Sequence, residues 1–271
     1  MLLNDKVAVV YGGGGFVGGA VARSFAAEGA RVFLAGRTSA KLEKVAAAIT
    51  DAGGKAHVAV LDTLDEEAVD QHADDVAASA GRIDIAFNAV TFGDVQGALL
   101  IDMPVSHATQ PVNDAMRSHF LTVRANARHM ASQRSGVIMT CTGYGAPSPE
   151  LGATMVAWNV LEGLYRQWAC ELGSHGIRVA WLRTGGFHES ILGAADYTSI
   201  YNYSDGATVA VADTVTDDSV QEMVEALEAD TMLGRLPTLA EAGASAVYLA
   251  SDHARGVTAT AINLTSGAMP D

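Results

Sequence analysis

A cluster of glycines near the start of the chain is the feature most directly suited to chemistry. Four glycines occupy positions 12–15 and Gly18 follows, between an apolar segment at 6–11 and a helical pattern at 16–28. Glycine lets the backbone approach a pyrophosphate closely, and a helix start offers unpaired N–H groups and a positive dipole end. A tight turn without a ligand is the alternative. We predict a phosphate-binding turn with contacts from Gly12, Gly15, Phe16, Val17 and Gly18.

The residues after the second apolar segment indicate which dinucleotide would bind. A carboxylate at this point would hold the ribose 2′-hydroxyl of NAD(H), but the sequence there is Ala35-Gly36-Arg37-Thr38 and contains no acid. The guanidinium of Arg37 can pair with a 2′-phosphate. The sequence therefore favours NADP(H) over NAD(H), and the alternative is that Arg37 is an ordinary solvated charge.

The segments that must position these residues alternate between strand and helix patterns. Apolar, β-branched segments predict strands at 6–11, 31–35, 56–61, 83–87, 136–141, 177–182 and 260–264. Amphipathic or apolar helical patterns fall at 16–28, 39–50, 66–80, 112–132, 151–172 and 239–250. Such alternation predicts an α/β fold, a Rossmann-type doubly wound parallel sheet of about seven strands with helices on both faces. Residues 186–235 are expected to be irregular and then helical.

Composition limits the organisation and the partners of the chain. Its 271 residues, without a linker or an internal repeat, predict one domain over 1–271. A net charge of −14 argues against a nucleic-acid partner. The start of the chain has no signal-peptide pattern and no apolar run is long enough for a membrane span, so we expect a cytoplasmic protein. Cys141 and Cys170 lack metal-ligand spacing, so we expect reduced core thiols and no metal site.

Four segments carry a resemblance to a known family. VAVVYGGGGFVGGAVARSFAAEGARVFLAGRTSAKLE, IDIAFNAV, LEGLYRQWACELGSHGIRVAWLRTGG and LGRLPTLAEAGASAVYLASDHARGVTATAINLTSGA together resemble the short-chain dehydrogenase/reductase superfamily over nearly the whole chain. The resemblance implies an NAD(P)-binding domain in which Asp62 meets the adenine ring. Thr63, Asn88 and Ala89 are the further cofactor contacts that it implies. Asn88 alone is kept from the family's Asn-Asn-Ala-Gly, since Ala89, Val90 and Thr91 replace the rest.

The same resemblance predicts a non-standard active site. Members of the family use a Tyr-x-x-x-Lys pair as acid/base machinery, and aligning LEGL places Thr154 and Trp158 at these two positions. The serine position falls at Thr142 or Gly143, and the helper asparagine falls near Ala115, with Asn113 close but out of register. No lysine follows Lys55 in the sequence. A threonine hydroxyl is too weak an acid to replace a lysine-assisted phenol at neutral pH.

Polar residues after the fifth and sixth predicted strands could act instead, because ligands bind beyond the carboxyl ends of such strands. The candidate catalytic residues are Thr142, Tyr144, Thr154 and His188. Glu189 could orient His188, and Arg183 could bind an anionic substrate or the pyrophosphate, or only cap its strand. Trp158 could simply fill the space of the lysine. Tyr144 could instead be a loop residue that packs against substrate or solvent.

The resemblance also implies a substrate lid at about 190–231 and a homo-oligomer. The lid segment contains Tyr197, Tyr201 and Tyr203, which suit an apolar or aromatic small-molecule substrate, although the loop could equally pack on its own aromatic rings. A homo-tetramer or homo-dimer would form through the helix at 151–172 and the C-terminal helix and strand.

Three functions remain open from the sequence. The first is an NADP(H)-dependent oxidoreductase that acts on a small carbonyl or alcohol with a replaced acid. The second is a non-redox lyase or isomerase on the same scaffold. The third is a non-catalytic protein that binds NADP(H).

Overall fold

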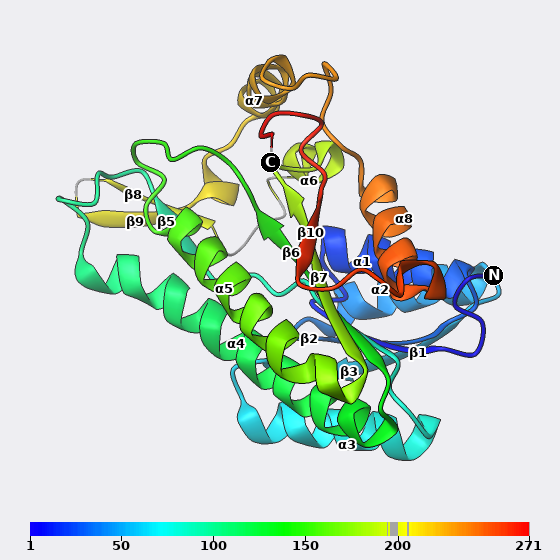
Figure 1. The fold of residues 1–271 in the computed structure, drawn as a ribbon. Helices are drawn as coiled ribbons and strands as arrows, with labels where there is room; N and C mark the ends of the chain where they lie inside the picture. Colours follow the sequence, from blue (N-terminus) through cyan, green and yellow to red (C-terminus); the bar gives the residue numbers. More distant parts are fainter. Residues whose placement is uncertain (194, 196–199, 205, 271) are drawn as a thin grey trace.

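A seven-stranded parallel sheet forms the centre of the molecule. The computed structural model describes residues 1–193, 195, 200–204 and 206–270. The strand order is β10-β7-β6-β4-β1-β2-β3, with every neighbouring pair parallel (Figure 1). The strands are β1 (Val7–Tyr11), β2 (Arg31–Gly36), β3 (Lys55–Val60), β4 (Ile85–Asn88), β6 (Gly136–Gly143), β7 (Ile177–Thr184) and β10 (Thr260–Asn263). The predicted Rossmann-type doubly wound fold is therefore confirmed.

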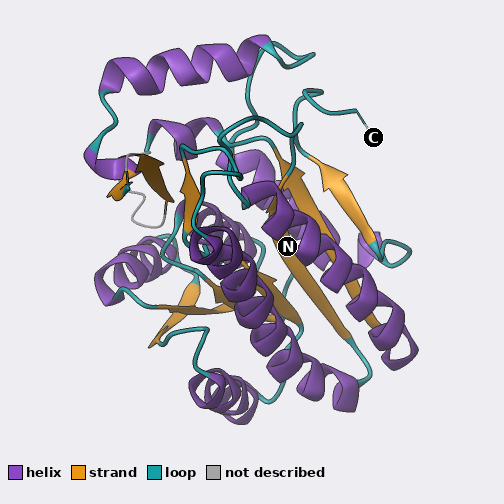
Figure 2. Ribbon diagram, turned by 90° about the vertical axis from the view of Figure 1, so that its left-hand side faces the viewer, coloured by secondary structure: helices purple, strands orange, loops and turns teal. Residues whose placement is uncertain are grey.

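Helices cover both faces of this sheet, as Figure 1 and the turned view in Figure 2 show. One face carries α1 (Phe16–Ala27), α2 (Ser39–Asp51) and α8 (Leu239–Ala250). The other face carries α3 (Glu66–Ala80), α4 (Val105–Gln133) and α5 (Thr154–Leu172). Short helices are α6 (His188–Leu192), η1 (Gly173–His175), η3 (Val211–Asp213) and η4 (Asp252–Ala254), and α7 (Asp217–Ala229) lies beyond the carboxyl ends of the strands. In the part of the chain that the structure describes, no helix is both long and apolar enough to cross a membrane.

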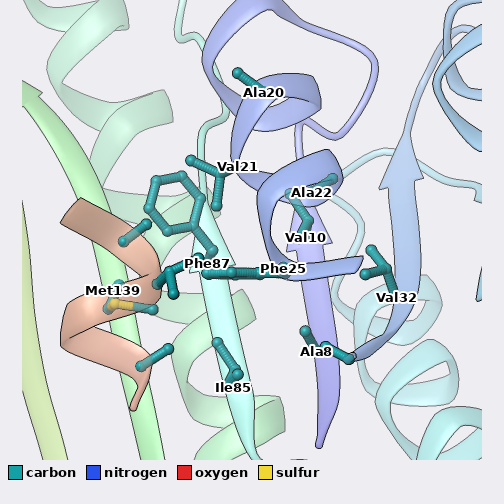
Figure 3. Packing of buried hydrophobic residues seen from close by; sticks show 14 of the residues in the cluster. Ala8, Val10, Ala20, Val21, Ala22, Phe25, Val32, Ile85, Phe87 and Met139 are labelled. Carbon is teal, nitrogen blue, oxygen red and sulfur yellow. The ribbon is translucent and has the colours of Figure 1, made fainter. Parts of the chain in front are cut away.

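Each face of the sheet has its own apolar core. Under α1 and α8, the rings of Phe25 and Phe87 meet edge to face with centroids 6.4 Å apart, and both side chains are fully buried (Figure 3). Under α4 and α5, the largest buried side chains include Tyr165 and Trp181. Burial of an aromatic side chain of this size contributes roughly 1.5–3 kcal/mol. Because all seven strands are parallel, their carboxyl ends lie together at one edge of the sheet.

The structure differs from the sequence prediction around residues 94–111. Helix α4 begins at Val105, not at 112, and Pro111 lies inside it. A proline is normally taken to mark the end of a helix, because it lacks the backbone N–H that a helical hydrogen bond needs. Here the two added turns are supported from outside, since the ring of His107 packs edge to face on Tyr203 with centroids 5.0 Å apart.

A second, three-stranded sheet was not predicted. It consists of β5 (Asp94–Gln96), β8 (Ile200–Ser204) and β9 (Ala207–Ala210), in the order β5-β8-β9. Strands β5 and β8 are parallel although about a hundred residues separate them in the chain. The expectation that this part of 186–235 is irregular is therefore wrong, because pairing with a distant segment defines these short strands. Tyr197, one of the predicted lid tyrosines, lies outside the described residues.

At the opposite, amino-terminal edge of the main sheet, Asp84 joins three strands. Its backbone N–H donates to the Val7 carbonyl, its carbonyl accepts from Val137, and its carboxylate accepts from the Val7 N–H at 2.9 Å. Arg82 donates to both carboxylate oxygens. Because the Asp84 side chain is only 4% exposed, its removal leaves a buried N–H without a partner.

We therefore expect Asp84→Ala to lower the free energy of unfolding by about 2 kcal/mol. Urea denaturation monitored by circular dichroism measures this loss. Asp102→Ala, which removes an exposed carboxylate, serves as the matched control and should change the free energy little. Equal stability of the two variants would contradict the role given to Asp84.

Candidate functional site

The glycine turn after β1 brings three backbone segments into close contact. Gly12 has φ of +72°, and its N–H donates to the Ala35 carbonyl at the end of β2. A Cβ on Gly12 would overlap the Ala89 carbonyl after β4, and a Cβ on Gly18 would overlap the Gly12 carbonyl. The turn therefore needs glycine at both positions. Helix α1 starts directly after it, with Gly15 as an N-cap that makes no side-chain hydrogen bond.

A groove runs along this edge of the sheet, formed by three adjoining cavities. The largest, of about 470 Å³, lies at the start of α1, and its neighbours extend past the ends of β2 and β4. Thr91 lines all three cavities, which makes the groove continuous. Nine of the ten predicted cofactor contacts line it: Gly12, Gly15, Phe16, Val17, Gly18, Arg37, Asp62, Thr63 and Ala89.

Asn88, the tenth predicted contact, is turned away from the groove. Its amide donates to the Thr122 hydroxyl at 2.7 Å and accepts from the Val90 N–H at 2.9 Å. The side chain is 3% exposed. Asn88 therefore fixes the backbone conformation of residues 88–90, and Ala89 and Val90 of this segment line the groove.

The groove gathers positive charge in an otherwise acidic protein. Arg37 and Lys41 line the cavity at the end of β2, and Arg23 and Lys44 line the cavity at the start of α1 with Lys41. Arg37 is exposed and makes no ion pair within the described residues. Sequence reasoning found Arg37 but missed the other three, although Lys41 and Lys44 follow Arg37 by about one and two helical turns.

At the other end of the edge, one face of α5 meets the end of β6 and the segment that follows β4. Thr154 and Trp158 lie one turn apart on this face. The indole of Trp158 packs against Phe92 with ring centroids 4.6 Å apart, and a Cβ on Gly143 would lie 2.7 Å from its Cδ1. The indole thus occupies the space in front of Gly143.

Two of the candidate residues after the strands are already engaged with the buried carboxylate of Glu162. The Thr142 hydroxyl is fully buried and lies 3.3 Å from Glu162 Oε1, and Arg183 donates to both Glu162 oxygens at 2.6 and 2.7 Å. Burial opposes ionisation of Glu162, but the hydrogen bond and charge of Arg183 hold its pKa below the usual value. The Arg183 guanidinium also stacks over Tyr144, 4.6 Å from the ring centroid. Arg183 is therefore part of the protein framework.

The proposed pairing of His188 with Glu189 is wrong. His188 Nδ1 lies 3.3 Å from Glu228 Oε1, at the end of α7. The carboxylate of Glu189 instead accepts from the Leu239 N–H at the start of α8. Adjacent residues on a short helix point in different directions, so neighbours in sequence did not become partners.

The expectation of two core thiols is also only half met. Cys141 is half-buried, and burial raises the pKa of its thiol to about 12. Cys170 is exposed on α5.

A carboxyl group that sequence reasoning did not select lies beside Thr154. Asp94 and Gln96 are on β5, two residues apart, and the Gln96 amide donates to the Thr154 hydroxyl at 3.3 Å. Asp94 Oδ1 is buried and has no hydrogen-bond partner among the described residues. Burial raises the pKa of the Asp94 carboxyl to about 6, while the Thr154 hydroxyl favours the ionised form. Nothing in the local sequence marks Asp94, because β5 exists only through its pairing with β8.

Comparison with known proteins identifies the family. The sequence model of the family described as enoyl-(acyl carrier protein) reductase matches residues 16–202, which is more than half of the chain. An uncharacterized oxidoreductase of Bacillus subtilis is 28% identical over 98% of this chain and 92% of its own length. An uncharacterized oxidoreductase of Mycobacterium tuberculosis is 38% identical over 128 residues, which are 45% of this chain and 46% of that protein.

The fold has close counterparts among solved structures. The crystal structure of an NAD⁺-bound xylitol dehydrogenase superposes with a TM-score of 0.82 over 98% of this chain and all of that one, at 22% identity. With the groove at the carboxyl ends of the strands and the family match over residues 16–202, the chain belongs to the short-chain dehydrogenase/reductase superfamily of oxidoreductases, whose members bind an NAD(P) cofactor.

Proposed function

We propose that this protein is an NADP(H)-dependent oxidoreductase that acts on a small carbonyl or alcohol with a non-standard active site. The observation that carries the proposal is the cationic end of the groove, where Arg37 and Lys41 line one cavity and β2 ends without an acid. A carboxylate there would favour the 2′-hydroxyl of NAD(H), whereas two cations favour the 2′-phosphate of NADP(H).

The groove also fits the rest of such a cofactor. Helix α1 begins without a side-chain cap, so its first N–H groups are available to a pyrophosphate. Gly12 and Gly18 let the turn, the start of α1 and the chain after β4 pack closely, and Asp62 and Thr63, which line the groove, would hold the adenine end. When bound, the nicotinamide supplies hydride chemistry, and the protein positions it.

The substrate end favours an apolar or aromatic compound. Trp158 and Phe92 form an aromatic wall in front of Gly143, and Tyr201 from the segment at 190–231 lines the same groove as Phe92. We propose that this segment acts as the substrate lid of a single domain. The homo-oligomer through α5, α8 and β10 and the cytoplasmic location stay predictions.

A non-catalytic NADP(H)-binding protein is the second candidate. The close fit of Trp158 to Gly143 favours it, because an indole has only one N–H to donate and cannot titrate at this point of the site. No arrangement of residues favours the lyase or isomerase in the same way.

Titration with NADPH, followed by a panel of aromatic and aliphatic aldehydes and ketones, separates these candidates. We expect micromolar or tighter NADPH binding, detected by quenching of protein fluorescence. Loss of reduced-nicotinamide absorbance with at least one carbonyl compound supports the oxidoreductase. Tight NADPH binding without any oxidation supports the non-catalytic protein, and failure of a folded sample to bind either dinucleotide contradicts both.

Arg37→Ala tests the cofactor preference. Loss of charge-assisted hydrogen bonds to the 2′-phosphate should weaken NADPH binding roughly tenfold to hundredfold and leave NADH binding within about twofold. Isothermal titration with both cofactors measures the ratio. Lys55→Ala, at the far end of β3, removes the same charge outside the groove and should affect neither cofactor. Equal losses for NADPH and NADH would refute the preference.

Gly143→Ala and Trp158→Ala test whether the two positions are fitted to each other. In the native background, the added Cβ meets the indole, so Gly143→Ala should cost about 1–3 kcal/mol of unfolding free energy. In the Trp158→Ala background the same change should cost far less. Thermal unfolding of the four proteins in a double-mutant cycle measures the coupling, and additive losses would show that the indole does not occupy this space.

A further inference from the structure

The Asp94 carboxyl has the features of a group kept ready for a ligand. One of its oxygens is shielded from solvent and lacks a hydrogen-bond partner among the described residues. A buried polar atom without a partner costs about 1–3 kcal/mol, so its retention calls for an explanation. Asp94 also takes part in no ion pair within the described part of the chain.

The position of Asp94 is that of a residue in front of the sheet. Strand β4 ends at Asn88, and the chain then passes Thr91 and Phe92, which line the groove, before it reaches Asp94. Ligands of open α/β sheets bind beyond these carboxyl ends. The segment that leads to Asp94 is therefore a wall of the site.

The face of α5 that looks toward β5 and β6 ties Asp94 to the other groups of the site. Thr154, Trp158 and Glu162 follow one another at intervals of one turn on this face. Thr154 meets Asp94 and Gln96 of β5, Trp158 meets Gly143, and Glu162 meets Thr142, both of β6. Thr154 is the first residue of α5, so Asp94 and Gln96 meet this helix at its start, next to the segment that follows β6.

We propose that Asp94 exchanges the proton that accompanies hydride transfer, and that Thr154 and Gln96 position its carboxyl group. The proposal rests on the proposed oxidoreductase function and names its acid/base. Neither α5 nor the loop after β6 then needs to supply the titrating group.

The proton and electron balance of the step is complete. In alcohol oxidation, the substrate O–H bond breaks and its proton passes to the Asp94 carboxylate. The carbinol C–H bond breaks, its electron pair leaves with the hydrogen as hydride to the oxidised cofactor, and the oxygen lone pair closes the C=O bond. In carbonyl reduction, the protonated Asp94 returns the proton to the oxygen. Because burial brings the pKa of Asp94 to about 6, both forms are accessible near neutral pH.

Carbon-13 NMR of protein labelled at the aspartate carboxyl carbons tests the placement without any substrate. Asp94→Asn identifies the signal. We expect it to titrate near pH 6 and to shift when NADPH is added, but not when adenosine 2′,5′-bisphosphate is added, because this fragment lacks the nicotinamide. An ordinary pKa, or a signal that ignores bound NADPH, overturns the proposal. Failure of NADPH to bind would instead overturn the proposed function.

Kinetics with a carbonyl compound that the native protein reduces tests the chemical role. Asp94→Asn should lower kcat roughly 10²- to 10⁴-fold and leave the Kd of NADPH within twofold. Asp102→Asn, an exposed aspartate a few residues away, should leave kcat unchanged. Retention of native kcat by Asp94→Asn overturns the proposal while the oxidoreductase function stands.

Thr154→Val tests the positioning role if Asp94→Asn folds poorly. Loss of the hydroxyl that favours the carboxylate should move the pH midpoint of kcat upward, and Thr154→Ser should restore it. An unchanged midpoint in Thr154→Val would contradict the link between the two side chains.

The pH dependence of stability provides a further readout of the same carboxyl. The pKa of Asp94 is raised in the folded state from 3.8, so folding takes up a proton between about pH 4 and pH 6 and native stability falls as pH rises through this window. Asp94→Asn should remove this fall, whereas Asp102→Asn should keep it. Parallel stability curves for the native protein and Asp94→Asn would show that the carboxyl is not buried as described.

Discussion

The contact between the backbone of the glycine turn and the chain after β4 is the constraint on which the site depends. Gly12 and Gly18 allow the turn, the start of α1 and the Ala89 carbonyl to approach without any intervening side chain. This contact directs the start of α1 into the groove and makes the ends of β1, β2 and β4 parts of one surface. Any side chain at either glycine would separate these elements and with them the walls of the groove.

The opposite end of the edge is organised around α5. Its inner face carries an alcohol, an indole and a carboxylate at successive turns, and each meets a different partner: Asp94 and Gln96, Gly143, and Arg183 with Thr142. The Trp158 indole fills the space in front of Gly143, so a side chain at residue 143 would overlap the indole. Because these residues contact one another, we expect the effects of substitutions among them on stability to be non-additive.

The two ends of this sheet edge also differ in the charged residues that they carry. The protein carries a net charge of −14, yet Arg23, Arg37, Lys41 and Lys44 collect around the start of α1 and the end of β2. At the α5 end, the buried Glu162 is compensated by Arg183 and Arg166, whereas Asp94 is not compensated by any cation in the described part of the chain. The start of α1 and the end of β2 thus suit phosphates, whereas β5 carries a carboxyl whose pKa is raised by burial to about 6.

The parallel α/β fold, the glycine turn and the position of Arg37 at the end of β2 could all be predicted from the amino-acid sequence. Strand and helix periodicity and glycine spacing are local properties, so they are visible in short stretches of sequence. The pairing of polar groups could not be predicted in this way and follows from the three-dimensional fold: His188 meets Glu228, Arg183 meets Glu162, and Thr154 meets Asp94. The three-dimensional fold also determines that β5 and β8 exist, that α4 continues through Pro111 and that Cys170 is exposed. These features depend on contacts between segments that are far apart in the chain, and no local sequence pattern records such contacts.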